Sequence, residues 1–376
     1  MSHPDPFADP EPRPPVPPPV PPPAPPSPSA TARESDLGEQ PDIVPWGPPG
    51  SGKTTLLATM LYMLTMRAVN KDDRLFYDVF PADDNAREFL EREVADLSRG
   101  ILPQPTRVGD AAVMTSRSFF IGLRDRERTG LWGRFHRLLL MDAAGEETHP
   151  RSDYQNTYWE RVRHARGVIM VVNMSDAQAP VRYQKGTEAS YRILIETFLR
   201  RAREKYHCKP YLAICLAQAD RVYTNPEETY QVLTPKEVDE MNRTENEPRE
   251  RFKQIVGKDT YDYLSNYLGG NGTKAQERFK IFITSATGWY RDPHIGWQPN
   301  VEQTPTGWRM RATGDNWWTI GVLYPLMWLF DKIEADRYSE QRKKQRGLIK
   351  KYQERLTNQT ILKERIALPK DHPYWL

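Results

Sequence analysis

The sequence predicts an α/β fold in which helices cover both faces of a mostly parallel sheet. Short apolar runs rich in β-branched residues alternate with longer amphipathic stretches, which is the pattern of strand and helix repeats. Several runs are apolar throughout, for example Leu138–Met141 and Val168–Val172. Strands of this kind are expected inside a sheet that has helices on both of its faces.

From about residue 41 onward, the chain divides into predicted strands and helices. The predicted strands after the first are Val113–Arg124, Arg137–Met141, Gly167–Asn173, Tyr211–Ala217 and Phe279–Thr284. The predicted helices are Thr54–Met66, Asp84–Arg99 and Glu188–Lys205. The first strand is short, with only Ile43 and Val44 strand-like, because Pro45 has no N–H for a central ladder.

Composition excludes several classes of protein. The 376 residues carry a formal net charge of +3, which gives no electrostatic reason to expect nucleic acid or a membrane as partner. The two cysteines, Cys208 and Cys215, form no zinc or disulfide pattern, so a reducing cytosol fits best. No signal peptide is recognisable, and Thr319–Phe330 is too short an apolar stretch to span a bilayer. We therefore expect a cytoplasmic protein without a membrane span.

The domain organisation follows from changes in composition. Half of residues 1–30 are proline, which predicts a disordered Pro-rich tail over residues 1–40. The tail is either a spacer, the simpler interpretation, or a ligand for an aromatic groove on a partner protein. Residues 41–330 form the predicted domain, with a helical and loop insertion at 221–278 and a packed Trp-rich loop at 289–318. Residues 331–376 predict a charged C-terminal helix and tail, which we expect to dock on a partner.

The strongest motif is Gly47-Pro48-Pro49-Gly50-Ser51-Gly52-Lys53-Thr54, which matches G-x-x-x-x-G-K-[ST] at every fixed position. Its glycines let consecutive amides face a phosphate, Lys53 reaches the β- and γ-phosphates, and the Thr54 hydroxyl binds Mg²⁺. The motif predicts a P-loop NTPase fold, a three-layer α/β/α sandwich with a C-terminal helical extension. The predicted nucleotide contacts here are Gly47, Gly50, Ser51, Gly52, Lys53, Thr54 and Thr55.

A second motif, Asp142-Ala143-Ala144-Gly145-Glu146, follows an apolar strand at the sheet edge where such folds bind ligands. Asp142 is a candidate for holding a Mg²⁺ water, and the Gly145 amide for meeting the γ-phosphate. ATPases of the AAA+ type usually place Glu directly after this Asp. The Asp-x-x-Gly spacing instead favours switch II of a GTPase.

A third pair of motifs favours guanine. One strand ends in Ala217-Gln218-Ala219-Asp220, and another in Ser285-Ala286-Thr287-Gly288. Asp220 is predicted to accept hydrogen bonds from guanine N1 and N2, and the Ala286 amide to donate to O6. Adenine lacks both features, so mismatched polar groups would remain unpaired. The predicted base contacts are therefore Gln218, Asp220, Ser285, Ala286 and Thr287. Ala217 and Gln218 depart from the usual [NT]-K-x-D pattern, which predicts a modest affinity for guanine.

Together with Leu102–Thr106 and Pro325–Leu329, these motifs resemble the bacterial double-GTPase family over about residues 41 to 330. The resemblance implies a TRAFAC-type P-loop GTPase. It also implies that the protein acts together with partner proteins in a multi-gene, defence-like conflict system of prokaryotes.

Hydrolysis of GTP requires Mg²⁺, a phosphate cradle and a positioned water. The candidate catalytic residues are Lys53, Thr106, Gly145 and Glu146. Thr106 is the switch I candidate for contacting Mg²⁺ and γ-phosphate, with Thr115 as a weaker rival and a solvent-facing loop threonine as the alternative. The predicted metal ligands are therefore Thr54, Thr106 and Asp142. Glu146 stands where small GTPases place a water-orienting Gln; its carboxylate is a possible general base but repels the γ-phosphate.

The sequence thus predicts a GTP-binding and GTP-hydrolysing switch with slow hydrolysis that a partner stimulates. Its cofactors would be Mg²⁺ and GTP, with ATP second. Two alternatives remain: an ATP-dependent P-loop enzyme, and a scaffold that binds nucleotide without hydrolysing it.

Overall fold

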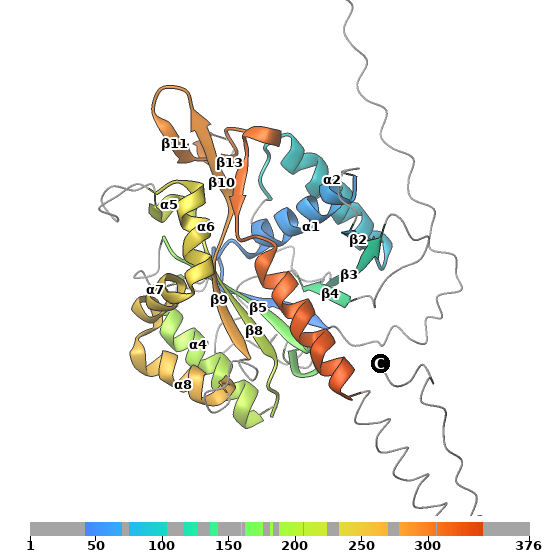
Figure 1. Cartoon of the computed structure of the whole chain (residues 1–376), viewed down its shortest axis with the longest axis vertical. Coiled ribbons are helices and arrows are strands. Elements are labelled where there is room, and N and C mark those ends of the chain that lie inside the picture. Colours follow the sequence, from blue (N-terminus) through green and yellow to red (C-terminus); the bar gives the residue numbers. More distant parts are fainter. Residues whose placement is uncertain are drawn as a thin grey trace, which may run out of the picture. The chain divides into compact units, whose positions relative to one another are not determined.

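The computed structural model describes residues 42–69, 75–103, 116–125, 136–141, 159, 162–175, 181–182, 188–205, 207–223, 233–269, 278–305 and 307–340 (Figure 1). The structural statements that follow concern these residues. The Pro-rich tail and the residues after 340 lie outside them. The described chain alternates strands and helices, in agreement with the α/β class predicted from the sequence.

The central element is a seven-stranded sheet with the order β2-β3-β4-β1-β5-β8-β9. Strands β4, β1, β5, β8 and β9 run parallel, whereas β3 is antiparallel to both β2 and β4. The sheet is therefore mostly parallel, as expected. Its strands are β1 (Ile43–Trp46), β2 (Leu75–Pro81), β3 (Ser116–Asp125), β4 (His136–Met141), β5 (Gly167–Asn173), β8 (Tyr211–Ala217) and β9 (Phe279–Ile283).

Strand β1 contains Pro45 although it lies in the middle of the sheet. All four residues of β1 pair with β5, from Ile43–Gly167 to Trp46–Met170. The register with β4 contains one pair, Ile43–Leu138, and it ends before the proline. Because proline has no N–H to donate, a full ladder on both sides is not available to this strand. The strand is held in the sheet mainly through β5.

The strands send alternate residues into two hydrophobic clusters, one on each face of the sheet. On β5, Val168, Met170 and Val172 belong to one cluster. Ile169 and Val171, which lie between them, belong to the other. This alternation is what a strand buried on both faces requires. The first face packs on α4 (Tyr191–Arg200), α6 (Pro235–Thr244), α7 (Asn246–Val256) and α8 (Lys258–Leu268). The second packs on α1 (Lys53–Val69), α2 (Asp84–Ser98) and a helix over residues 324–340.

Three of these helices begin at side chains that satisfy their first free amides. Asp83 accepts a hydrogen bond from the Ala86 amide at 2.7 Å, and Ser190 accepts one from Ile193 at 3.3 Å. Thr234 and Glu237 form a capping box at the start of α6. Each such cap contributes about 1 kcal/mol of helix stability. Helix α4 continues into a π-helical turn, Arg201–Lys205.

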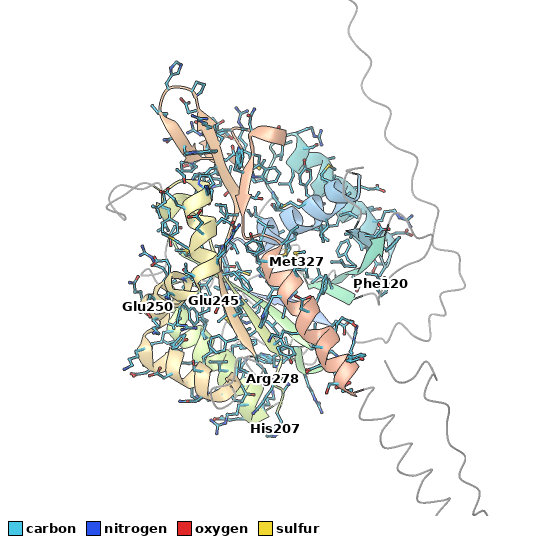
Figure 2. The ribbon with its side chains drawn as sticks, in the orientation of Figure 1. Phe120, His207, Glu245, Glu250, Arg278 and Met327 are labelled. Carbon is cyan, nitrogen blue, oxygen red and sulfur yellow. The ribbon has the colours of Figure 1, made fainter. Side chains whose placement is uncertain are left out.

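The helix over residues 324–340 crosses the boundary that composition predicts at residue 331. Leu329 and Ile333, on either side of that boundary, are both fully buried in the same cluster. Met327, labelled in Figure 2, packs against this cluster as well. Arg337 forms two short hydrogen bonds with the Asp42 carboxylate, at 2.6 and 2.7 Å. The first part of the charged segment is therefore packed on the sheet because its apolar stripe is wide enough to be buried.

The Trp-rich segment forms short strands where an irregular loop was expected. Strands β10 (Ser285–Asp292), β11 (Gly296–Pro299) and β14 (Trp318–Ile320) form a three-stranded sheet in the order β11-β10-β14. Strands β12 (Glu302–Thr304) and β13 (Gly307–Arg309) form a hairpin. Trp289 of β10 is fully buried, whereas Trp308 and Trp318 are about half exposed. The pairing of β10 with β14, for example Trp289 with Trp318, joins strands distant in sequence, which a local pattern cannot predict.

The polar segment predicted as an insertion holds helices α6 to α8. Val238, Phe252 and Leu264, one from each helix, are fully buried in the cluster on the first face of the sheet. These helices are therefore part of the layer that covers the sheet. Among the described helices, none is both long and apolar enough to cross a membrane.

Candidate nucleotide-binding site

The predicted phosphate loop connects the end of β1 to the start of α1. Gly50 and Gly52 have φ values of +71° and +84°, in the left-handed region that favours glycine. Gly47 has a different constraint: a Cβ there would lie 2.7 Å from Ser51 Oγ and 3.0 Å from the Val171 carbonyl oxygen. Gly50 and Gly52 are therefore required by the backbone conformation, and Gly47 is required by close packing.

Lys53 is the first residue of α1, and its side chain folds back over the loop. Its Nζ donates a hydrogen bond to the Gly47 carbonyl oxygen at 2.9 Å, and the residue is only 8% exposed. Ser51 is buried as well, and its Oγ has no hydrogen-bond partner in the described part of the chain. Thr54 and Thr55 are half-buried in the first turn of the helix. A buried cation thus lies beside the amino end of a helix, where an anion is favoured.

Polar side chains follow the end of the neighbouring strand β5. The Asn173 carboxamide oxygen accepts a hydrogen bond from the Ser175 amide at 2.9 Å. Ser175 Oγ lies 2.8 Å from Asn173 Oδ1 and 2.9 Å from Gln218 Oε1, so its single proton is shared between two acceptors. Sequence reasoning missed Asn173 and Ser175. The sequence does contain a signal for Asn173 as a site residue, because it ends an apolar strand at the ligand-binding edge of the sheet.

Gln218 follows β8 in a left-handed conformation, with a φ of +64°. Its Oε1 accepts a hydrogen bond from Arg221 at 3.1 Å, in addition to the contact with Ser175. Its Nε2 lies 3.7 Å from the position that a Cβ on Gly52 would occupy. Gln218 therefore connects the phosphate loop to the ends of both β5 and β8. Arg221 extends this connection, because its guanidinium lies 5.3 Å from the centre of the Trp308 ring.

Asp220 lies in α5 (Ala219–Tyr223) and is fully buried. Its Oδ1 accepts a short hydrogen bond from Ser285, and its Oδ2 accepts one from Thr287 at 3.1 Å. Ser285 Oγ in turn accepts a hydrogen bond from the Gly288 amide at 2.9 Å. Burial raises the pKa of Asp220 to about 6, although the hydrogen bonds from Ser285 and Thr287 oppose this shift. Ala286, between the two donors, is half-buried.

The structure therefore brings the predicted phosphate loop to the same edge of the sheet as Gln218, Asp220 and residues 285–287. The remaining predicted site residues lie outside the described residues: Thr106, Asp142, Gly145 and Glu146. Among the described residues, no three His, Cys, Asp or Glu side chains are grouped as a metal site. Of the three predicted metal ligands, only Thr54 is described.

The chain was compared with known protein families. The family model described as Double-GTPase 2 matches residues 43–260, which is more than half of the chain. The chain belongs to the Double-GTPase 2 family. This confirms the family resemblance predicted from the motifs, and a GTPase-type function with GTP binding follows from it. No curated protein matches the sequence.

Some residues of the candidate site lie inside the range that matches the Double-GTPase 2 family, and others lie beyond it. The matched range begins at β1 and ends within α8, so it contains the phosphate loop, Gln218 and Asp220. Ser285, Ala286 and Thr287 lie beyond it. The hydrogen bonds of Asp220 to Ser285 and Thr287 therefore connect a residue inside the matched range to two residues outside it.

Proposed function

We propose that this protein is a GTP-binding switch that hydrolyses GTP slowly and whose hydrolysis is stimulated by a partner protein. The observation that carries the proposal is the position of Asp220, buried at the same sheet edge as the phosphate loop and held by Ser285 and Thr287. Membership of the Double-GTPase 2 family supports the nucleotide class. The setting in a bacterial, defence-like multi-protein system rests on the family resemblance alone.

The chemistry of Asp220 suits guanine. A carboxylate oxygen accepts about two hydrogen bonds, and in this proposal each Asp220 oxygen accepts one N–H of the base in addition to its bond from Ser285 or Thr287. Two parallel N–H groups, N1–H and N2–H of guanine, match this pair of acceptors. Adenine presents a lone pair at N1, which faces a carboxylate unfavourably. In this proposal the Ala286 amide donates to guanine O6.

The phosphates belong at the loop. Lys53 would move from the Gly47 carbonyl to the β- and γ-phosphates, a small rearrangement because its amine already lies over the loop. Thr54 would hold Mg²⁺ together with Asp142 and Thr106, and the metal would neutralise charge that develops on the phosphates. Gly145 and Glu146 are proposed to contact the γ-phosphate and the attacking water.

Gln218 supplies the support that Ala217 lacks. The usual residue at position 217 is Asn or Thr, which braces the phosphate loop, and alanine has no polar side chain for this role. The Gln218 carboxamide lies beside Gly52 and is fixed by Ser175 and Arg221. We infer that Gln218 braces the loop from the neighbouring position.

The test is binding of labelled GTP to the full chain, with ATP as competitor. We expect Lys53→Ala to abolish binding of both nucleotides, and Asp220→Asn to remove the preference for GTP over ATP. Asp262→Asn, an exposed aspartate on α8, serves as the matched control and should change neither. Equal competition by ATP in the unaltered protein would favour an ATP-dependent enzyme instead.

Hydrolysis is tested separately, by phosphate release with and without Glu146→Gln. A switch of the proposed kind gives slow release that this substitution changes. No release from either protein, even with cell extract added as a source of partners, would support a scaffold that binds nucleotide without turnover.

A further inference from the structure

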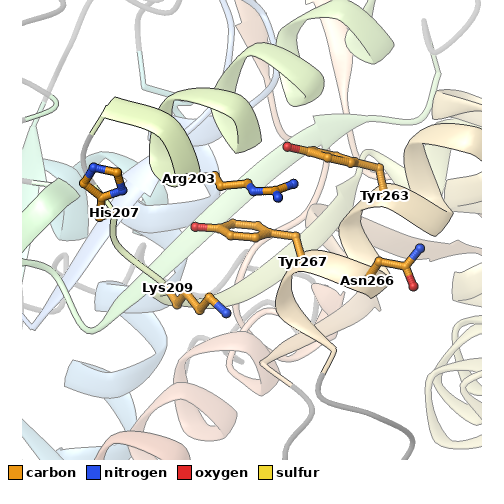
Figure 3. A pocket seen from close by; sticks show the side chains of 6 residues that line it. All are labelled: Arg203, His207, Lys209, Tyr263, Asn266 and Tyr267. Atoms are coloured by element: carbon orange, nitrogen blue, oxygen red, sulfur yellow. The ribbon is translucent and has the colours of Figure 1, made fainter.

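A second cavity lies at the opposite end of β8 from Gln218. It has a volume of about 440 Å³ and is lined by Arg203, His207, Lys209, Tyr263, Asn266 and Tyr267 (Figure 3). The first three residues come from the segment between α4 and β8, and the others from α8. Lys209 lies two residues before β8 begins, whereas Gln218 directly follows its end. The cavity is therefore separate from the phosphate loop.

The positive charge of this cavity is not compensated. No carboxylate lines it. Its two charged side chains, Arg203 and Lys209, are exposed, and neither forms an ion pair within the described part of the chain. Cations around a concave surface raise the local concentration of anions. The cavity therefore attracts a negatively charged ligand.

A neighbouring cavity provides an internal comparison. It has a volume of about 590 Å³, shares His207 and Lys209 with the first, and is also lined by Arg166 and Arg278. There, however, Arg166 lies 3.5 Å from Glu340, and Arg278 lies 3.7 Å from Asp336. Figure 2 shows His207 and Arg278 at this end of the molecule. The arginines with carboxylate partners thus belong to the second cavity, whereas Arg203, which lines only the first of the two, forms no ion pair among the described residues.

Two tyrosine rings form one wall of the first cavity. The Tyr263 and Tyr267 rings are nearly parallel, with an interplanar angle of 15° and centroids 6.5 Å apart. The Tyr267 hydroxyl donates a hydrogen bond to the Cys208 carbonyl oxygen at 2.6 Å, which fixes the ring. Burial raises the pKa of Tyr267 to about 12, so the phenol stays neutral at physiological pH. The wall is therefore an uncharged aromatic surface with one fixed ring, and Lys209 Nζ lies 5.5 Å from the centre of that Tyr267 ring.

The backbone around the cavity has two unusual features. Arg203 lies in the π-helical turn that follows α4. Such turns are rare in proteins, and those that occur are often found at functional sites. His207 is a non-glycine residue with a φ of +49°. A left-handed backbone conformation costs free energy in a non-glycine residue, and it persists where the surrounding structure requires it. Both features lie in the segment that carries the cations of the cavity.

We propose that this cavity binds a nucleoside phosphate, at a site distinct from the phosphate loop. Arg203 and Lys209 bind the phosphate, and the base stacks on the wall formed by Tyr263 and Tyr267. The Asn266 carboxamide offers a donor and an acceptor to the edge of the base. A volume of 440 Å³ lies within the range of small-molecule sites.

The test uses the full chain carrying Lys53→Ala, so that the phosphate loop does not contribute. AMP and GMP are titrated by calorimetry, with inorganic phosphate as a third probe. We expect saturable binding of a nucleotide that Arg203→Ala with Lys209→Ala weakens by about tenfold or more. Arg249→Ala, which removes an arginine on α7 outside the cavity, should leave the affinity unchanged.

A second variant isolates the aromatic wall. Tyr267→Leu should weaken nucleotide binding several-fold while leaving the affinity for inorganic phosphate unchanged. If this variant fails to fold, the exposed Asn266→Ala tests the base contact in its place. Three outcomes would overturn the proposal: no nucleotide binding, no effect of the basic substitutions, or equal affinity for inorganic phosphate and nucleotides. None of them bears on the GTP site, which is measured in the protein that retains Lys53.

Discussion

The Ser285 hydroxyl donates a hydrogen bond to the Asp220 carboxylate, and both side chains are fully buried. The two residues are 65 positions apart in the sequence, at the start of β10 and in the short helix after β8. A buried carboxylate costs free energy unless it is hydrogen-bonded. Ser285 therefore fixes the orientation of the acceptor that we propose for guanine.

Removing this donor should affect both stability and recognition. Ser285→Ala leaves a buried carboxylate oxygen with fewer partners, which costs about 1–3 kcal/mol of unfolding free energy. We expect the affinity for GTP to fall by about tenfold, while the affinity for ATP changes little. Urea unfolding and nucleotide titration measure the two effects. Ser98→Ala, at an exposed position at the end of α2, is the control, and an equal loss in that variant would contradict the assignment.

The raised pKa of Asp220 predicts that nucleotide selectivity depends on pH. The proposed guanine contact needs the ionised carboxylate, so the preference for GTP should decline as pH falls through about 6. The phosphates of the nucleotide also titrate near this pH. The quantity to measure is therefore the ratio of the GTP and ATP dissociation constants between pH 5 and 8, in which the phosphate titration cancels. A ratio that is flat over this range, or that stays pH-dependent in Asp220→Asn, would argue against the role of Asp220.

The same pKa shift makes stability change with pH in the opposite direction from the preference for GTP. Because the pKa of Asp220 is about 6 in the folded protein and the ordinary pKa of an aspartate is 3.8, the folded protein binds the proton more tightly than the unfolded chain. The contribution of this group to the unfolding free energy is fully present below pH 3.8 and is lost as pH rises through about 6. Asp220→Asn removes this contribution and its pH dependence, and unfolding curves measured across that interval would show the difference.

The left-handed conformation of Gly52 predicts a loss of nucleotide binding when a side chain is added. Gly52→Ala places a Cβ at a φ of +84°, which costs about 1–2 kcal/mol, and brings it within 3.7 Å of Gln218. The matched control is Gly296→Ala, with a φ of +83° and nothing within 4 Å of the added atom. Both variants should lose similar stability, but only Gly52→Ala should lose affinity for GTP. If the two variants bind GTP alike, the backbone shape of the loop is not what the nucleotide requires.

The contact between Gln218 and Ser175 predicts coupling between two strand ends. Each single substitution, Gln218→Ala or Ser175→Ala, should weaken GTP binding, since the hydrogen bond at 2.9 Å helps to position the carboxamide beside the phosphate loop. The double variant should bind GTP about as well as the weaker single variant, because the two residues act through one contact. Strict additivity of the two losses would show that they act independently.

The ion pair of Arg337 and Asp42 predicts that the last described helix stabilises the start of β1. The two side chains are 16% and 13% exposed, so Arg337→Ala should leave a poorly solvated carboxylate and cost about 2 kcal/mol or more. Arg243→Ala breaks an ion pair of similar length whose arginine is 72% exposed, and it should have no measurable effect. Thermal unfolding of both variants makes the comparison, and equal shifts would contradict the prediction.

Much of the main sheet could be predicted from the sequence, because its central strands are apolar throughout. The predicted and observed bounds of β5 and β8 are identical. The order of the motifs also predicted that Gln218, Asp220 and residues 285–287 would meet the phosphate loop at one sheet edge, since parallel strands end on the same side. Their roles in binding remain predictions.

Other features depend on contacts that no local pattern contains. Strands β11 to β14 are only three or four residues long, and β14 pairs with the distant strand β10, so their residues resemble a loop in the sequence. Pro45 weakened the case for β1, which is held by its pairing with β5. The hydrogen bond between Ser175 and Gln218 joins residues 43 positions apart, and neither belongs to a motif that predicts the other.

The single residue pair between β1 and β4 has a mechanical consequence. All four β1 residues pair with β5, and β8 and β9 extend that side of the sheet, while β2, β3 and β4 pair extensively with one another. The backbone pairing between β4 and β1 is thus a weak seam in the sheet, although one hydrophobic cluster spans it, with Leu138 on one side and Ile169 on the other. Amide protons on the two sides of this seam should exchange with different protection, and a pulling force applied across the sheet should separate it there first.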